Sequence, residues 1–257
     1  MGGEQVEGRQ AVRELLAAGR RPVREVWIVS DLEPSAPIDE IERLAARRGV
    51  RVLAVSRGKL ERAARTDAPQ GVLAHAAPLR EVDLDTLCRA RPPVPFLVVL
   101  DGVTDPHNVG ALLRSAECAG ATGVVLPRHR AVHVTATVAK VAAGAIEHLA
   151  MAVVPGVPNA LRRLADLGVR SIGLDAAAPT SLFDMDLDAE APVALVMGAE
   201  GKGLAPLSRR RCSGLASIPQ FGALGALNVA AAGAVACFEI ARRRAVSAGP
   251  RGVGLSP

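Results

Sequence analysis

The sequence has very few aromatic side chains. Of its 257 residues one is Trp, four are Phe and none is Tyr, so aromatic residues make up 2% of the chain. RNA-binding surfaces that stack several splayed bases on aromatic rings are therefore nearly excluded. Hydrophobic residues make up 49% and charged residues 22%, an ordinary globular balance that argues against a disordered or fibrous protein.

Cysteine is also scarce, and its four copies are scattered along the chain. Cys88, Cys118, Cys212 and Cys237 form no Cys-x-x-Cys pair and have no nearby histidine at ligand spacing. The sequence therefore predicts neither a zinc site nor a disulfide framework, and free thiols suit a reducing cytosol. We expect no metal ligand among the five histidines.

No secretory signal or membrane span is visible in the sequence. Residues 1–5 lack a basic segment followed by an apolar one. The longest apolar stretch, 222–238, is interrupted by Asn228 and is shorter than the about 20 residues that a span needs. We expect a soluble, cytoplasmic protein without a membrane partner. The net charge of +5 permits a polyanionic partner but does not demand one.

Residues 1–76 have the pattern of a small α/β domain. Apolar residues recur with helical period over 8–18 and 38–45, and Ser56 is placed to cap a third, basic helix. Short apolar strands are expected at 26–29, 50–55 and 71–74. Residues 77–94 have a weaker pattern and end in a proline-rich run, which we interpret as a linker because proline stiffens the chain and cannot donate to a sheet.

A second domain is expected over 95–246, followed by a flexible tail at 247–257 that is rich in Gly, Ser and Pro. Nearly continuous apolar strands alternate here with helices. This alternation is typical of a mostly parallel sheet with helices on both faces. The expected strands are 96–100, 123–126, 151–154, 171–174, 193–197 and 215–218, and the last helix runs from near Asn228 to about Arg244.

Ligands of open α/β sheets collect at the carboxyl ends of the strands, so the loops that follow strands are the first candidates for a site. The loop at 101–108 leads into Asn108, predicted to be a helix N-cap, and Arg114 follows almost two turns later. The loop at 197–203 is rich in glycine, which lets its backbone approach a ligand closely. The apolar loop at 218–228 ends in a second asparagine cap, Asn228.

Taken one at a time, these loops leave plainer interpretations open. Asn108 could be only a cap, Arg114 and Glu200 only solvated charges, and the last loop only the start of a core helix. The glycine loop is not a Walker loop, because Lys202 is followed by Gly203 and not by Ser or Thr. A generic nucleotide-binding α/β protein is an alternative that the glycines alone would support.

Taken together, the loops resemble the SpoU (TrmH) branch of the SPOUT methyltransferases, the RNA ribose 2′-O-methyltransferases. The motifs are Asp101-Gly-Val-Thr-Asp-Pro-His-Asn-Val-Gly-Ala-Leu-Leu-Arg114, Leu195-Val-Met-Gly-Ala-Glu-Gly201, and Ile218-Pro with Ala226-Leu-Asn-Val229. The likeness covers 96–244 and is greatest to the guanosine 2′-O-methyltransferases of 23S ribosomal RNA. Residues 1–76 resemble the L30e-like substrate-binding domain of the same enzymes, through Glu7-Gly-Arg-Gln-Ala-Val-Arg-Glu-Leu-Leu16 and Pro69-Gln-Gly-Val-Leu-Ala74.

The resemblance implies a fold, a cofactor and an assembly. The second domain would contain a trefoil knot, one of the rare exceptions to the rule that chains are unknotted. S-adenosylmethionine would lie folded in this knot, and the enzyme would be a homodimer whose active site draws on both subunits. The family's motif positions correspond here to catalytic Asn108, Arg114, Glu200 and Asn228 and to cofactor-binding Gly198, Ile218 and Leu227, with no metal.

The chemistry of these residue types fits methyl transfer to a ribose hydroxyl. Ile218 and Leu227 beside a glycine-rich loop offer a bound adenine aliphatic walls and backbone hydrogen bonds. In this family the motif arginine is proposed to activate the hydroxyl, but a guanidinium with a pKa above about 12 is a poor base. Our hypothesis is that Arg114 fixes the target phosphate and stabilises the developing alkoxide, with Glu200 and Asn108 holding the geometry.

The prediction is therefore an S-adenosylmethionine-dependent enzyme that methylates a ribose 2′-hydroxyl of RNA, with a guanosine of 23S ribosomal RNA as the favoured substrate and no DNA partner. The same reaction on transfer RNA, or a resistance-type ribosomal methylase, is the nearest alternative. Ala226 and Ala230 stand where the family usually has serine. This departure motivates another alternative, a non-catalytic RNA-binding assembly factor that retains the fold.

Overall fold

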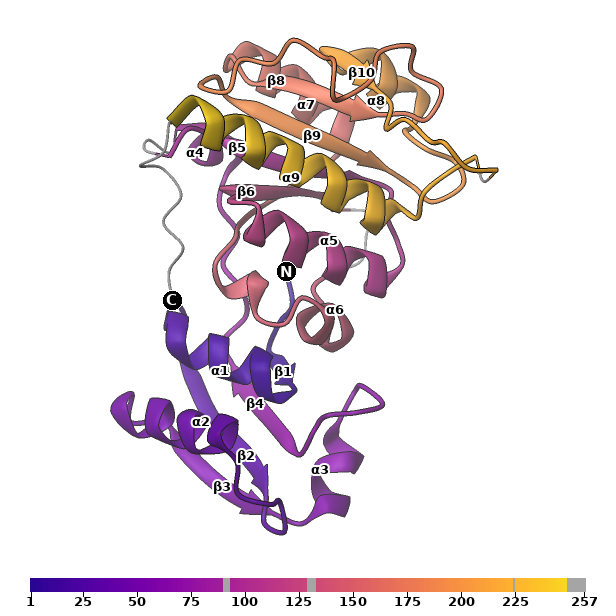
Figure 1. The fold of residues 1–257 in the computed structure, drawn as a ribbon. Helices are drawn as coiled ribbons and strands as arrows, with labels where there is room; N and C mark the ends of the chain where they lie inside the picture. Colours follow the sequence, from indigo (N-terminus) through magenta and orange to yellow (C-terminus); the bar gives the residue numbers. More distant parts are fainter. Residues whose placement is uncertain (90–92, 129–132, 224, 249–257) are drawn as a thin grey trace. The chain divides into compact units, whose positions relative to one another are not determined.

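The computed structural model describes residues 1–89, 93–128, 133–223 and 225–248 (Figure 1). Its internal contacts divide the chain into two compact units. Unit 1 comprises Met1–Arg80, Asp105–Arg114 and Val132–His148, and unit 2 comprises Glu81–Thr104, Ser115–Ala131 and Leu149–Pro257. The small amino-terminal domain thus forms a unit with two segments from later in the chain.

Unit 1 is built on a four-stranded mixed sheet with the order β1-β4-β2-β3. Strand β4 pairs antiparallel with β1 and β2, whereas β2 and β3 are parallel. The strands are β1 (Gln5–Glu7), β2 (Val23–Val29), β3 (Arg51–Val55) and β4 (Val72–Ala76). The helices are α1 (Arg9–Ala18), α2 (Ala36–Arg47), α3 (Arg57–Ala63), α6 (Ala136–Val141) and the 3-10 turn η1 (Ala145–Glu147), and α5 (Pro106–Cys118) begins in this unit and ends in unit 2.

The helices of unit 1 follow from local signals that the sequence carries. On α1, Val12, Leu15 and Leu16 form the buried stripe, and Gly19 ends the helix in the left-handed conformation with its N–H bonded to Leu15 O. The Ser56 hydroxyl accepts a hydrogen bond from the N–H of Lys59, which confirms the predicted cap of α3.

Unit 2 contains a six-stranded sheet with the order β10-β8-β9-β5-β6-β7, and every strand pair in it is parallel. The strands are β5 (Phe96–Asp101), β6 (Gly123–Pro127), β7 (Ala150–Val154), β8 (Arg170–Leu174), β9 (Val193–Gly198) and β10 (Gly214–Ala216). The helices are α4 (Leu84–Arg89), α7 (Val157–Asp166), α8 (Pro206–Arg211) and α9 (Val229–Ala248). The predicted parallel sheet is confirmed.

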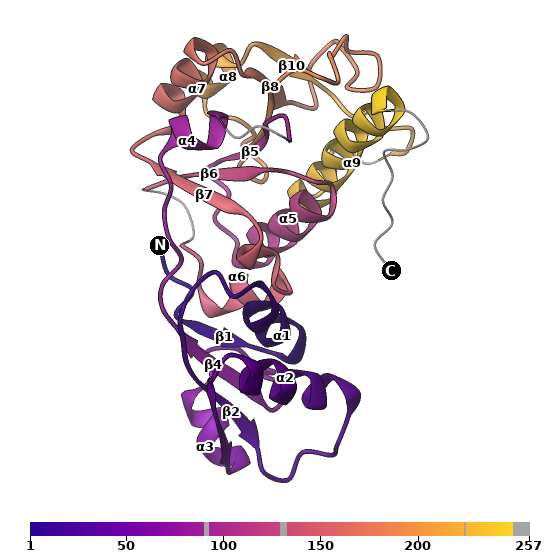
Figure 2. The same cartoon turned by 90° about the vertical axis from the view of Figure 1, so that its left-hand side faces the viewer.

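Helices cover both faces of this sheet, and Figure 2 shows α7 and α9 on opposite sides of it. Leu161 and Leu164 of α7 pack with Leu97, Val99 and Val196 in one buried cluster. On α9, Ala236, Cys237 and Ile240 are buried. Strands covered on both faces explain why the sequence shows continuous apolar runs in place of alternation.

Some expected boundaries differ in the structure. Part of the predicted linker, 77–94, forms α4, which buries Leu87 and Cys88 in the core of unit 2. The strand expected at 215–218 ends at Ala216, and the last helix continues past Arg244 to Ala248. Residues 249–257 of the predicted tail lie outside the described residues. No helix in the described part of the chain is both long and apolar enough to span a bilayer.

Candidate functional site

Unit 2 contains a cavity of about 440 Å³ at the carboxyl ends of three neighbouring strands. Leu174 ends β8, Gly198 ends β9 and Ala216 ends β10, and all of them line the cavity. The loops predicted to bind a ligand at 197–203 and 218–228 both contribute to its wall. This is the position expected for a ligand in an open parallel sheet.

Gly198 is required by the close approach of the loop that follows it. A Cβ at this position would lie 2.2 Å from the carbonyl carbon of Gly203, well inside contact distance. The loop closes on itself, because the N–H of Ala199 donates to Gly203 O and the N–H of Gly203 donates to Ala199 O at 2.9 and 2.8 Å. Gly201, at φ +74°, makes the turn between them.

Asp101 ties the beginning of the first motif to the glycine loop. It is buried, pairs with Gly198 across β5 and β9, and its Oδ2 accepts a hydrogen bond of 2.9 Å from the N–H of Ala205. Although the first motif begins at this residue, sequence reasoning assigned no role to it. The sequence did contain a signal for a functional role, because this carboxylate directly follows the predicted apolar strand at 96–100.

Asn228 joins the other two loops, and its predicted role as an N-cap is confirmed. Its Oδ1 accepts hydrogen bonds from the N–H groups of Ala230 and Ala231, at 2.8 and 3.3 Å, at the start of α9. Its Nδ2 donates to Oε1 of Glu200 at 2.9 Å. Glu200 lines the cavity together with Ile218 and Leu227. The structure therefore brings Gly198, Glu200, Ile218, Leu227 and Asn228 to one site.

An ion pair that sequence reasoning missed also lines the cavity. Nε of Arg209 donates to Oδ2 of Asp175 at 2.6 Å. The Arg209 hydrogen bond, helped by the N–H of Ala177, holds the pKa of Asp175 below its usual value. Arg209 stands in a run of three arginines, 209–211, a pattern that is typical of a solvated helix face. Asp175 offered a signal, because it follows the apolar strand β8 directly.

Asn108 and Arg114 lie on α5 in unit 1. Asn108 is buried in the first turn and Arg114 is exposed. The prediction that Asn108 is the N-cap is wrong, because the helix begins at Pro106 and Asp105 caps it. Oδ1 of Asp105 accepts from the N–H of His107, and its carbonyl accepts from the N–H of Val109, both at 3.0 Å. Proline is favoured at the first helical position, which moves the cap to the residue before it.

The cavity has the composition of a nucleoside site. Its volume lies within the range of about 300–1,000 Å³ that is usual for small-molecule pockets. Met197, Ile218 and Leu227 provide aliphatic walls, and Glu200 and Asp175 provide acceptors for hydroxyl or amino groups. Such a site suits S-adenosylmethionine, which carries a flat base with hydrogen-bonding edges, ribose hydroxyls and a cationic tail. Within the described residues, no three His, Cys, Asp or Glu side chains cluster as metal ligands would.

Comparison with known protein families identifies the family of this chain. The model of the SpoU rRNA Methylase family matches residues 95–238. The chain belongs to this family. A second family model, for the substrate-binding domain of RNA 2′-O ribose methyltransferases, matches residues 5–82. Each of the two sequence resemblances found in the motifs is thereby confirmed.

Individual relatives extend the likeness over nearly the whole chain. The 23S rRNA (guanosine-2′-O-)-methyltransferase RlmB of Shewanella oneidensis is 39% identical over 92% of this chain and 96% of its own length. The enzyme of the same name from Ralstonia nicotianae is 40% identical over 93% and 95%. Among solved structures, the SpoU methyltransferase AviRb from Streptomyces viridochromogenes, in complex with the cofactor AdoMet, matches with a TM-score of 0.77, 27% identity and coverage of 93% and 89%.

Proposed function

We propose that this protein transfers the methyl group of S-adenosylmethionine to a ribose 2′-hydroxyl of RNA, and that its substrate is a guanosine of 23S ribosomal RNA. The observation that carries the proposal is the cavity formed by Gly198, Ile218 and Leu227 at the ends of a parallel sheet. It occurs in a chain that matches guanosine 2′-O-methyltransferases of 23S rRNA at 39% and 40% identity along almost all of its length.

In this proposal the cavity residues bind the cofactor, which supplies a methyl group activated by a sulfonium. Ile218 and Leu227 cover the faces of the adenine and exclude water from them. Gly198 permits the tight loop at 198–203 that borders the cavity. Asp175, which stays ionised because Arg209 lowers its pKa, offers a carboxylate to a hydroxyl or ammonium group.

The target nucleotide is assigned to the remaining motif residues. We propose that Arg114 binds the phosphate beside the target ribose and stabilises negative charge that develops on the 2′-oxygen. A guanidinium offers a planar fork of donors for this purpose. Glu200, oriented by the Nδ2 donor of Asn228, and Asn108 position the reacting groups. Positioning supplies much of the rate when a hydroxyl must be held in line with a methyl group.

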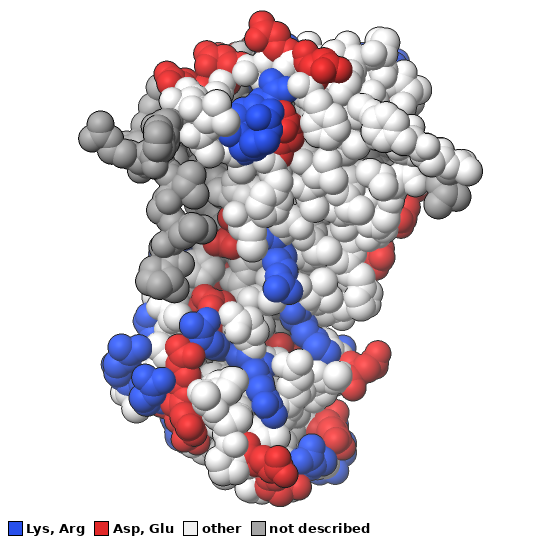
Figure 3. Space-filling model, viewed as in Figure 1, with Lys and Arg blue, Asp and Glu red and all other residues white. Residues whose placement is uncertain are grey.

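We also propose that the protein acts as a cytoplasmic homodimer and that the loops around the cavity form the trefoil knot expected of its fold family. An apolar surface around α9 supports the dimer. Phe238 on this helix is 51% exposed, and Leu227 and Val235 are also exposed. Figure 3 shows that the surface over the amino-terminal part of α9 carries almost no Lys, Arg, Asp or Glu side chains. An exposed apolar patch of this kind marks an interaction surface.

Methyl transfer from tritiated S-adenosylmethionine to total bacterial RNA tests the proposed function. We expect incorporation into 23S ribosomal RNA, and mapping of ribose methylation should locate it at a guanosine. Incorporation confined to small RNA would support the transfer RNA reaction. Calorimetric binding of the cofactor without transfer to any RNA would support the assembly factor to which Ala226 and Ala230 point.

A further inference from the structure

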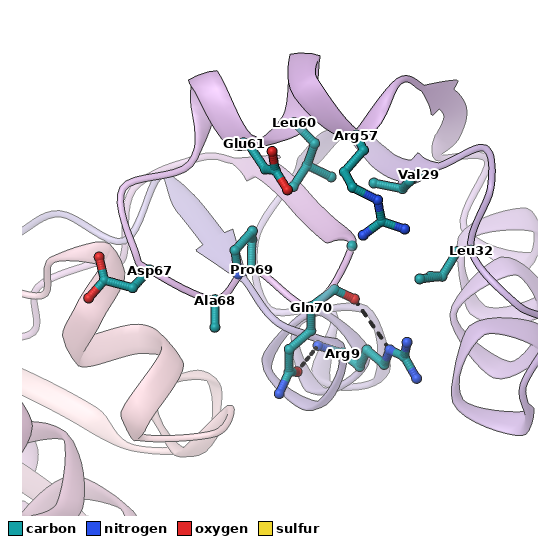
Figure 4. A pocket seen from close by; sticks show the side chains of 11 residues that line it. Arg9, Val29, Leu32, Arg57, Leu60, Glu61, Asp67, Ala68, Pro69 and Gln70 are labelled. Carbon is teal, nitrogen blue, oxygen red and sulfur yellow. Dashed lines mark hydrogen bonds between the residues drawn. The ribbon is translucent and has the colours of Figure 1, made fainter.

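The small domain of unit 1 contains a cavity of its own, of about 470 Å³, which shares no residue with the cofactor cavity (Figure 4). It is bordered by the start of α1, the end of β2 and the loop after it, one side of α3, and the loop that precedes β4. The cavity combines charged side chains with an aliphatic floor. No step of the proposed reaction uses it.

Within the described residues, neither of the two arginines that border this cavity forms a close ion pair. Nη2 of Arg57 lies 3.4 Å from Oδ1 of Asp31, and these side chains are 51% and 65% exposed, so the pair is weak. Arg9 uses its Nε for Gln70 O at 3.3 Å. In the part of the chain that the structure describes, the terminal nitrogens of Arg9 have no acceptor. Two neighbouring guanidinium groups repel one another unless an anion lies between them.

The position of Arg9 is fixed by an unusual backbone conformation at Gln70. Gln70 has φ +56°, a left-handed value that is uncommon for a residue other than glycine. In this conformation its side-chain Oε1 accepts from the N–H of Arg9 at 3.0 Å, while its carbonyl accepts from the Arg9 guanidinium. Both dashed contacts are visible in Figure 4. The arginine is therefore held at the cavity before any ligand binds.

The rest of the cavity suits the base and the ribose of a nucleotide. Val29 and Leu60 are buried and form an apolar floor with Leu32. Glu61 and Asp67 also border the cavity, and in Figure 4 Asp67 lies at the end away from the guanidinium groups. A carboxylate at that end of the cavity can accept a hydrogen bond from the amino group of a base. A ligand that fits this cavity has an anion at one end and a ring that carries hydrogen-bond donors at the other, as a nucleotide does.

We propose that this cavity binds one unpaired nucleotide of the substrate RNA, with its phosphate between Arg9 and Arg57 and its base over Leu60, directed towards Asp67. The inference rests on the proposed function, since it takes RNA to be the substrate. It deepens that function by giving the small domain a defined single-strand contact. RNA-binding proteins commonly hold unpaired nucleotides in such pockets, because unpaired bases can leave the stack.

The test compares Arg9→Gln, Arg57→Gln and the double variant with Arg51→Gln, which removes a positive charge from β3 of the same domain. Binding of a 23S rRNA transcript is measured as a function of salt concentration. Each lost phosphate contact should reduce the slope of log K against log salt by about 0.7 to 1. We expect the slope to fall by about that amount in each single variant, by about twice that in the double variant, and not in Arg51→Gln.

Kinetics provide a second readout on the same variants. The KM for RNA should rise roughly tenfold in the single variants, while kcat at saturating RNA and calorimetric affinity for S-adenosylmethionine stay unchanged. An unchanged urea-unfolding transition shows that the variants are folded. A salt slope and a KM equal to those of the unmodified protein would overturn the inference.

The source of the anion is tested by competition. Inorganic phosphate and guanosine monophosphate are added at millimolar concentration to the RNA-binding assay. We expect neither to displace the RNA, because a single nucleotide lacks the other contacts of the strand. Displacement by phosphate alone that is lost in the double variant would indicate a free-anion site and overturn the nucleotide assignment. Failure of the unmodified protein to methylate any RNA, with the salt slopes as expected, would overturn the proposed function and leave this pocket as an RNA site.

Discussion

The side-chain amide of Asn228 donates a hydrogen bond of 2.9 Å to Oε1 of Glu200, while its oxygen caps the first turn of α9. One side chain therefore fixes both the start of a 20-residue helix and the carboxylate of the glycine loop. The two roles use opposite ends of the amide. Substitutions at position 228 can remove one role and keep the other.

Asn228→Asp separates these roles. Aspartate caps helices about as well as asparagine, so we expect the free energy of unfolding to change by only a few tenths of a kcal/mol. The new carboxylate repels Glu200 where the amide attracted it, and methyl transfer should fall at least about tenfold. Asn228→Ala, which removes both roles, should also lose about 1 kcal/mol of stability. Urea unfolding and a transfer assay measure both effects, and wild-type turnover in Asn228→Asp would argue against a catalytic role for the contact.

Arg114→Lys tests the proposed use of the guanidinium fork. Lysine retains the positive charge but cannot donate two parallel hydrogen bonds to a phosphate. We expect kcat at saturating RNA to fall by about tenfold to a hundredfold, with cofactor affinity unchanged. Arg128→Lys, at an exposed arginine in unit 2, is the control and should retain full turnover. Full turnover in Arg114→Lys would show that charge alone is sufficient.

Gly198→Ala tests the tight loop beside the proposed cofactor cavity. The added Cβ would meet the backbone of Gly203 at 2.2 Å, so the loop must move. Overpacking of this kind typically costs about 1–3 kcal/mol, and the displaced loop should weaken binding of S-adenosylmethionine. Gly222→Ala is the matched control, because nothing lies within 4 Å of the added atom. Calorimetry on both variants distinguishes the steric effect at position 198 from the effect of replacing any glycine by alanine. Equal affinities of the two variants for S-adenosylmethionine would contradict the close contact between positions 198 and 203.

Much of the fold could be predicted from the sequence, because strands buried on both faces leave continuous apolar runs. The elements that were missed are short and owe their stability to distant partners. Strand β1 contains Gln5 and Glu7, which are polar in the sequence yet buried in the structure. The carboxylate of Glu7 accepts hydrogen bonds from the N–H groups of Arg65 and Thr66, 58 and 59 residues away. No local pattern can show that a carboxylate will be satisfied by such remote donors.

Some residues of the candidate site could be predicted from the sequence, and others could not. Gly198, Glu200 and Asn228 were found because the motif fixes their spacing within or beside a loop. The Asp175–Arg209 pair was missed because its partners are 34 residues apart and Arg209 stands in a run of arginines that looks solvated. Asn108 was predicted to be a cap because asparagine favours that role. In the structure the helix begins at Pro106, and the side chain of Asp105 before it accepts the capping hydrogen bond. Local residue preferences indicate candidate site residues, but only tertiary contacts determine which of them fill the predicted role.

The cysteines give a prediction that depends on pH. Burial raises the pKa of Cys88 and Cys212 to about 11 and that of Cys237 to about 12. At pH 8 a thiol with a pKa of 11 is ionised in only about one molecule in a thousand, so these groups should resist alkylation. Cys118 is exposed and should react first.

Mass spectrometry after iodoacetamide treatment checks this order. Between pH 8 and 9 we expect a single fast label, which Cys118→Ser abolishes, whereas unfolding in urea should expose all four thiols. Raising the pH increases the reactive thiolate fraction of every cysteine, but Cys88, Cys212 and Cys237 remain mostly protonated until the pH approaches 11. Rapid labelling of Cys88 or Cys237 in the folded protein at pH 8 would contradict the burial of these two side chains.

The stability of unit 1 should depend strongly on the buried ion pair between Arg21 and Glu147. The side chains are 3% and 1% exposed, and Nε of Arg21 lies 2.9 Å from Oε2 of Glu147. Nη1 of Arg21 also donates to the carbonyls of Gly3 and Ala77, both at 2.6 Å. Arg21→Met would leave a buried carboxylate without its cation, so we expect a loss of about 3–5 kcal/mol in urea unfolding.

Two further variants separate this electrostatic effect from lost packing. Arg21→Met combined with Glu147→Leu removes both charges and should recover most of the stability that Arg21→Met alone loses, because no charge is then left buried. Arg51→Met removes an arginine that is 69% exposed and paired with Glu25, and should change stability by less than about 1 kcal/mol. If the double variant were as unstable as Arg21→Met, the loss would come from packing and from the two carbonyl contacts, and the unpaired charge would not be its cause.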